Sequence, residues 1–325
     1  MNNSSQVEMN FLSLDDLVSE NHAYRKFLIL IDFEQLCLPL ISKYSCLGRG
    51  GYSVATGIKA LILQWMEDLS DRQLERYLQE NLAAKLFCDF LISDKTPDHS
   101  YFGKLRDRIG TEGIGDIFNQ IGSALSEAGY VSECFTFVDS TALITKGALW
   151  KERDEAIANK EEKLNNGNVS KYAADDQARY GCKGKNKHWF GYKNHCAVDM
   201  KCGFITKTAA TPANVNDANG LQHVCPNQGA VVADKGYCTK PAQDILKAKN
   251  CYDMTIKNRN MKNKNREKDK FISKIRSPYE NIFSKMNRRV RYRSIAKVQY
   301  QCFMEAIAFN LKRLVKIAAP PLKIA

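Results

Sequence analysis

Two short apolar runs, each leading into an aspartate, limit what this chain can fold into. The run Cys134–Val138 is rich in β-branched and aromatic residues and ends at Asp139. The run Gly229–Ala233 ends in the same way at Asp234. Such runs are typical of buried strands, so the sequence predicts a sheet with a carboxylate at the end of each of two strands. The alternative for each aspartate is that it caps the element after its strand.

The charge of the chain favours an acidic partner. The 325 residues carry a net charge of +12, with a pI of about 9.1, which points to nucleic acid or an anionic membrane surface. No apolar run approaches the ~20 residues of a spanning helix. The segment Met1–Gln6 has neither the basic nor the apolar region of a signal peptide. We therefore expect a cytoplasmic protein with no membrane partner.

The first 130 residues read as an all-helical N-terminal domain. A stretch dense in Leu, Ile and Phe, Ala23–Tyr44, predicts one long helix. Ser53 can cap a helix that runs through Met66, and Ser70 with Gln73 fits a capping box. A further helix start is predicted at 96–100. No strand pattern occurs in this region.

The pattern changes from Phe135 onward. Five strands are predicted there, and helices are predicted to begin at Asp217 and Pro241. An antiparallel trio followed by alternating helices and strands is the order of the ribonuclease H fold, an α/β fold with a mixed five-stranded sheet flanked by helices. We place this domain at 131–297, with a polar insertion at about 146–188 and a C-terminal helix and tail at 298–325. The predicted strands are 135–139, 189–199, 204–210, 230–234 and 252–256.

Positive charge is concentrated near the C-terminal end of the predicted domain. Between Lys257 and Arg293 there are 14 Lys and Arg residues against three acids, an excess of 11. Apolar residues recur from Ile275 to Val290 at spacings of three and four, which predicts an amphipathic helix. Glu280 lies on this helix. It either pairs with Arg276 at i, i+4 or supplies a third carboxylate beside the two aspartates.

Three carboxylates in a basic chain suggest phosphodiester chemistry. Two Mg²⁺ ions ~3.5–4 Å apart can serve the attacking and the leaving oxygen. Mg²⁺ prefers carboxylates and water, and Mn²⁺ can substitute for it. Asp139 would bridge both ions, while Asp234 and Glu280 would each hold one. Basic residues would bind the phosphates of the polyanion, with affinity that falls as salt rises. The candidates are Arg276, Arg288, Arg289, Lys285, Lys235, Lys193 and His195.

Lys193 and His195 have an open alternative. They are two apart on a predicted strand, so their side chains share a face of the sheet. If that face bears the site, they can contact phosphate. If it does not, His195 is a structural histidine.

Several motifs resemble the DDE transposases of bacterial insertion sequences, specifically the insertion sequence five family. They follow the family order along most of the chain. In the helical part they are Gly48–Tyr52, Leu69–Glu75 and Pro97–Arg106; in the rest they are Val138–Thr141, Asp175–Gly181, Phe190–His195, Thr211–Asp217, Ala233–Tyr237 and Ala308–Leu314.

The resemblance implies a transposase with Asp139, Asp234 and Glu280 as its acidic triad. It would bind the terminal inverted repeats of its element, cleave DNA with water and join the 3′-hydroxyl ends to target DNA. Its partners would be double-stranded DNA, at the element ends and the target, and further copies of itself in a homodimer or a higher assembly. The helical domain would supply end recognition and dimerisation.

One motif departs from the family pattern. Around Arg276 and Glu280 the family has a Tyr and a Lys, where this chain has Ser273 and Asn287. Arg288, beside Asn287, can replace the Lys. Two alternatives remain open: a ribonuclease-H-like nuclease without strand transfer, and a non-catalytic DNA-binding protein derived from a transposase.

Overall fold

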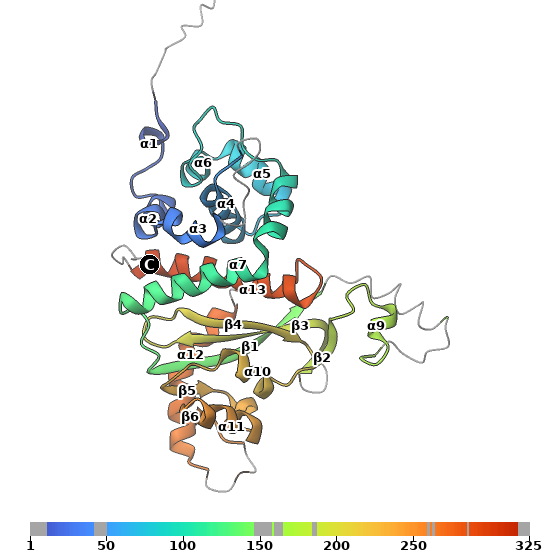
Figure 1. Cartoon of the computed structure of the whole chain (residues 1–325). Coiled ribbons are helices and arrows are strands. Elements are labelled where there is room, and N and C mark those ends of the chain that lie inside the picture. Colours follow the sequence, from blue (N-terminus) through green and yellow to red (C-terminus); the bar gives the residue numbers. More distant parts are fainter. Residues whose placement is uncertain are drawn as a thin grey trace, which may run out of the picture. The chain divides into compact units, whose positions relative to one another are not determined.

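The chain forms two compact units in this computed structural model (Figure 1). The structure describes residues 12–41, 51–145, 158, 165–183, 187–258, 261, 264–284 and 286–317. One unit spans Met1–Ile109 with Leu314–Ala325, and the other spans Gly110–Arg313. The division falls inside helix α7 (His99–Glu127), where Gly110 has φ 70° and ψ 176° and interrupts the helical backbone.

The first unit is helical over its described residues, as predicted. Ser53 accepts a hydrogen bond from the amide of Thr56, and Ser70 and Gln73 form a reciprocal capping box. The predicted single helix from Ala23 is instead two, because Ile31 is extended between them. The helices are α1 (Leu14–Leu17), α2 (Ala23–Leu30), α3 (Phe33–Ile41), α4 (Val54–Met66), α5 (Asp71–Glu80), α6 (Leu82–Phe87) and the first part of α7.

The second unit contains a mixed sheet with the strand order β4-β3-β1-β5-β6, while β2 pairs with the first part of β3. β1 is antiparallel to β3 and β3 to β4, whereas β5 is parallel to both β1 and β6. This is the predicted α/β fold with a ribonuclease-H-like sheet. The strands are β1 (Phe135–Ile144), β2 (Arg179–Lys183), β3 (Lys187–Asp199), β4 (Ile205–Pro212), β5 (Ala230–Ala233) and β6 (Tyr252–Thr255).

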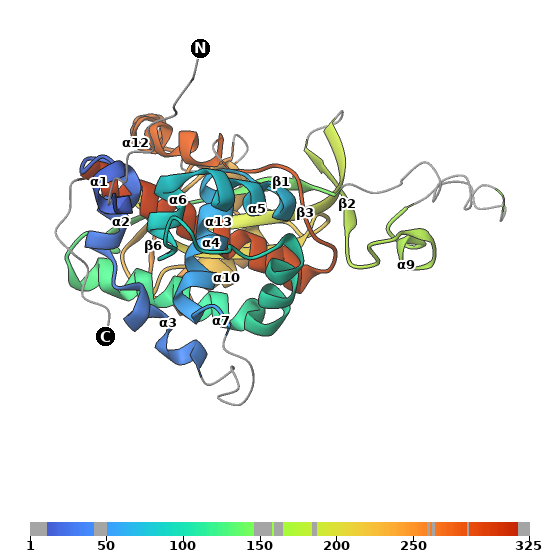
Figure 2. The same cartoon turned by 90° about the horizontal axis from the view of Figure 1, so that it is seen from above.

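Two strands differ from the sequence-based expectation. β2 is a sixth strand, which lies in the segment predicted as an insertion, and it forms with β3 the hairpin visible in Figure 2. β1 continues five residues beyond Asp139. It does so because β3 pairs with it as far as Ile144, whose amide and carbonyl also bond to Arg288 and Val290.

Helices cover both faces of this sheet. On one face, α10 (Asp217–Val224) and α11 (Lys240–Ala248) pack against side chains that include Val138. On the other, Phe137 contacts Tyr279 and Phe283 of α12 (Arg266–Ser284). Leu143 packs against α13 (Ile295–Ile317) on that same face. Odd-numbered residues of β1 therefore face α12 and α13.

The helix predicted over 275–290 is longer at its start and shorter at its end. α12 begins at Arg266, within the basic run, and ends at Ser284. Glu267 and Asp269 lie in its first turn, where negative charge complements the helix dipole. The remaining elements are α9 (Val169–Tyr172) and the short 3₁₀ helix η1 (Lys235–Tyr237).

Packing of α10 on the sheet depends on Gly220. A Cβ atom at this position would lie 2.2 Å from Cε1 of His195. We predict that Gly220→Ala lowers the free energy of unfolding by ~1–3 kcal/mol or more, the usual range for overpacking. Gly122→Ala is the matched control, since its Cβ would meet nothing within 4 Å in the described structure. Denaturant unfolding of the two variants measures the difference, and equal stabilities would contradict this packing.

Candidate active site on the α12 face of the sheet

Asp139 and Asp234 lie on the same face of the sheet. The parallel register pairs Phe137 with Val232, and each aspartate follows its member of this pair by two residues. Because side chains alternate along a strand, Asp139 points to the side of Phe137, which is the α12 side. Asp234, the residue after β5, continues from Val232 toward the same side. The structure thus brings together two of the three predicted carboxylates.

Asp139 is an acid held in an unfavourable environment. Burial raises its pKa to about 6, and the negative charge of Asp234 adds to this rise. The amide of Ser140 and the charges of Arg276 and Lys183 act in the opposite direction. The balance disfavours the ionised form of Asp139, mainly through burial, and a bound cation would favour that form.

Each aspartate uses one carboxylate oxygen for a local hydrogen bond. Oδ1 of Asp139 accepts from the amide of Ser140 at 2.8 Å, and Oδ1 of Asp234 accepts from the amide of Gly236 at 2.7 Å. Asp234 therefore also caps η1, as its structural alternative predicted. No protein donor within the described ranges bonds to Oδ2 of either residue. The Oδ2 atoms of Asp139 and Asp234 are therefore available to coordinate a cation.

Glu280 does not join the aspartates in this structure. It forms an ion pair with Arg276 on α12, where Nε of Arg276 donates to Oε1 at 2.9 Å. Its side chain is 47% exposed, against 17% for Arg276. In the part of the chain that is described, no three His, Cys, Asp or Glu side chains are close enough to hold a metal. The oxygen donors of Asp139 and Asp234 fit a hard cation. Glu280 lies one helix turn from Arg276 on α12 and is not part of this donor set.

The other basic candidates fall into three groups. Lys235, Arg288 and Arg289 are exposed, and the carbonyl of Arg288 bonds to the end of β1. Arg276 is half-buried, and its charge acts on Asp139. Lys285 lies outside the described residues.

Lys193 and His195 point away from Asp139. His195 is opposite Ser140 in the β1–β3 register, on the α10 face. Its side chain is buried, and Nε2 lies 2.8 Å from Oγ1 of Thr211. Nζ of Lys193 bonds to Asp217 at 2.8 Å. The geometry favours the structural alternative for His195, and it directs Lys193 to Asp217 rather than to the aspartates of the candidate site.

Two residues near the aspartates were not singled out from the sequence. Lys183 is exposed at the end of β2, and its charge favours the ionised form of Asp139. Tyr237 is buried in the α10 cluster with its hydroxyl close to both aspartates. Tyr237 could have been identified from the sequence, because it is the last residue of the motif Ala233–Tyr237. Lys183 gave no signal, because it depends on the unpredicted strand β2.

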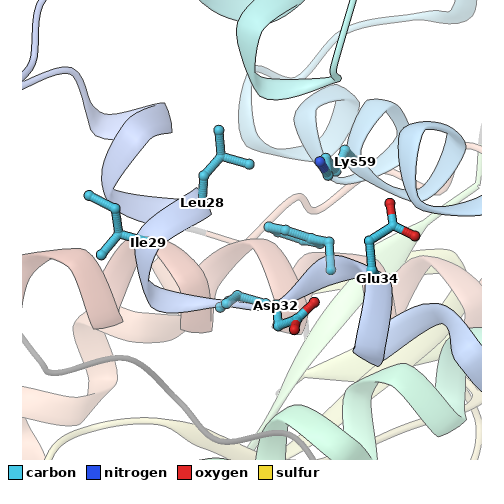
Figure 3. Close-up of a pocket in the computed structure, with 7 residues that line it drawn as sticks. Leu28, Ile29, Asp32, Glu34 and Lys59 are labelled. Atoms are coloured by element: carbon cyan, nitrogen blue, oxygen red, sulfur yellow. The ribbon is translucent and has the colours of Figure 1, made fainter.

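A separate cavity of about 370 Å³ lies in the helical unit (Figure 3). Its lining combines apolar Leu28 and Ile29 with Asp32, Glu34 and Lys59. Lys59 is buried and ion-paired with Asp89. The walls carry charges of both signs, so the cavity does not select strongly for either an anion or a cation.

Comparison with known proteins identifies the family. Residues 131–311 match the family described as Transposase DDE domain, and residues 12–108 match Transposase domain (DUF772). The chain belongs to the DDE transposase family. Members of this family are enzymes that cut and transfer DNA strands with divalent metal ions, so this chain is a transposase of the bacterial insertion-sequence type.

One solved structure shows a weak likeness to the transposase. It is the cryo-EM structure of the piggyBac transposase synaptic complex with hairpin DNA, at 9% identity and a TM-score of 0.39. The match covers 93% of this chain and 76% of that one. None of the described helices is both long enough and apolar enough to cross a membrane.

The placement of His195 predicts its protonation behaviour. Burial lowers the pKa of His195 to about 4, below the value near 6.5 of an unfolded chain. The neutral form is thus favoured in the fold, so stability is unaffected above pH 6.5 and falls as the pH drops from there toward 4. We predict that the Cε1 resonance of His195, followed by NMR, stays at its neutral position from pH 8 to about 5. A midpoint near 6.5 would show that the side chain is solvated.

Proposed function

We propose that this transposase binds the terminal inverted repeats of its own element, cleaves the DNA there and joins the freed 3′-hydroxyl ends to target DNA. The observation that carries the proposal is the aspartate pair, Asp139 and Asp234, on the face of the sheet against which the basic helix α12 packs. A phosphodiester has negative oxygens, which the basic helix would attract, and divalent metal held by the carboxylates would activate it for attack.

The cofactor in this proposal is Mg²⁺, for which Mn²⁺ substitutes. Asp139 and Asp234 would hold it through their available oxygens, and a pair of ions would recruit Glu280 as the third ligand. Bound there, the metal would activate the attacking oxygen and stabilise the leaving oxygen. The raised pKa of Asp139 supports this assignment, since a divalent cation would offset the charge that burial disfavours.

Glu280 and Arg276 can change partners together in this proposal. Their ion pair is exposed at Glu280, and such pairs contribute only ~0.3–0.5 kcal/mol, so it is readily broken. Release of Glu280 toward the aspartates would free the guanidinium of Arg276 for a phosphate. Arg276 is already close enough to act on the charge of Asp139. The same helix would therefore bring both a ligand and a phosphate clamp.

The DNA surface in this proposal surrounds the aspartates. Exposed Lys235, Arg288 and Arg289, with Arg276, would contact the phosphates of double-stranded DNA. Lys285 is also proposed to contact a phosphate, on the basis of its position in the sequence alone. The helical unit would recognise the element ends and support a homodimer or higher assembly. Lys193 and His195 are left out, because they bond within the protein on the other face.

The triad is tested by isosteric substitution. Asp139→Asn, Asp234→Asn and Glu280→Gln should each reduce Mg²⁺-dependent cleavage of a duplex carrying an element end by at least ~10³-fold, while binding changes little. Asp244→Asn, in an exposed i, i+4 pair on α11, is the control and should cleave normally. Cleavage retained in any one triad variant would remove that residue from the site. Joined products, as opposed to cut ends alone, would distinguish a transposase from a nuclease.

The role of Arg276 is tested by salt dependence. Arg276→Ala should weaken DNA binding and lower the slope of log affinity against log salt by about one, because one phosphate contact is lost. Lys240→Ala removes the same charge from a similar i, i+4 pair on α11 and serves as the control. An unchanged slope in Arg276→Ala would mean that the arginine only pairs with Glu280.

A further inference from the structure

The backbone alone does not fix the separation of the two aspartates. The ladder between β1 and β5 contains three residue pairs and ends at Phe137 and Val232. Asp139 and Asp234 both lie two residues beyond it. A site that binds a metal through two carboxylates needs their spacing held to a fraction of an ångström. Another contact must therefore connect the two segments beyond the ladder.

Tyr237 and Ser140 are placed to make that contact. Tyr237 follows Asp234 by three residues in η1, and Ser140 follows Asp139 directly. Both are on the α10 side of the sheet, behind the aspartates. Tyr237 is 1% exposed and packs in the cluster that contains Val138. Its hydroxyl has no partner at normal hydrogen-bond distance, and Ser140 is the hydroxyl that faces it.

The surrounding groups limit the direction of this contact. Burial, and then the negative charges of Asp139, Asp217 and Asp234, raise the pKa of Tyr237, while the hydroxyl of Ser140 acts in the opposite direction; the phenol keeps its proton and is able to donate. On the far side of Ser140 lies His195, its cross-strand neighbour. Nδ1 of this histidine is buried without a partner. With Nε2 donating to Thr211, Nδ1 is an acceptor.

These groups form a consistent sequence of donors and acceptors. Tyr237 can donate to the Ser140 hydroxyl, which can donate to Nδ1 of His195. The backbone of Ile144 bonds away from β3, and by alternation so does that of Ser140. Ser140 and His195 are thus a non-hydrogen-bonded pair, whose side chains come closest. Two buried polar atoms that otherwise lack partners would both be satisfied through Ser140.

We propose that Tyr237 and Ser140 are positioning residues, whose contact behind the sheet sets the spacing of Asp139 and Asp234 for metal binding. The proposal rests on the assignment of these aspartates as metal ligands. It gives His195 a part as the acceptor that orients the Ser140 hydroxyl. None of the three side chains touches the metal or the DNA.

The test measures Mn²⁺ binding to the full chain by electron paramagnetic resonance, without DNA. Tyr237→Phe and Ser140→Ala should each weaken binding about tenfold, the effect typical of groups that orient metal ligands. The double variant should be no weaker than either single one, because both remove the same contact. Tyr24→Phe is the matched control: it removes a phenol that faces another hydroxyl, that of Tyr77, at 3.0 Å in the helical unit. It should bind Mn²⁺ normally.

The outcomes separate this proposal from the one on which it depends. Wild-type affinity in Tyr237→Phe, with binding lost in Asp139→Asn, would overturn the positioning role alone. Unchanged binding in Asp139→Asn and Asp234→Asn would overturn the metal site itself. Additive losses in the double variant would show that Tyr237 and Ser140 act independently, which also contradicts the proposal. Thermal unfolding checks that each variant is folded.

Discussion

The parallel pairing of β1 with β5 is the interaction on which the site depends. It sets Phe137 beside Val232 and so sends Asp139 and Asp234 to one face, although 95 residues separate them in the chain. Antiparallel β3 holds β1 from its other side through Ile144. Because β5 ends at Ala233 while β1 continues, the edge of β1 beside Asp139 is not covered by the ladder.

The charges around Asp139 and Asp234 explain why a cation is proposed at this site. Burial disfavours the ionised form of Asp139, and the negative charge of Asp234 adds to this effect. Arg276 and Lys183 offset only part of this. Glu280 stays with Arg276 on α12, so only two of the three proposed ligands lie together in this structure. In the proposal, the divalent metal that this family uses would add positive charge beside the aspartates and attract Glu280 away from Arg276.

The sequence predicted the two strands that lead into the aspartates better than it predicted the elements around them. The apolar runs before Asp139 and Asp234 gave both strands, since burial and β-propensity act locally there. The length of β1 was missed because its polar second half is held by pairing with β3 and Arg288–Val290, which is a tertiary effect. β2 was missed for the same reason. The start of α12 was missed because its first two turns are mostly charged and lack the regular apolar spacing that predicts a helix from Ile275 onward.

The most direct measurement of the central claim is anomalous scattering from Mn²⁺ in crystals of the transposase with a DNA end. The account predicts a peak within coordination distance of carboxylate oxygens of both Asp139 and Asp234, and Glu280 turned from Arg276 toward it. A peak at other residues, or a fully occupied complex in which neither aspartate contacts the metal, would contradict it.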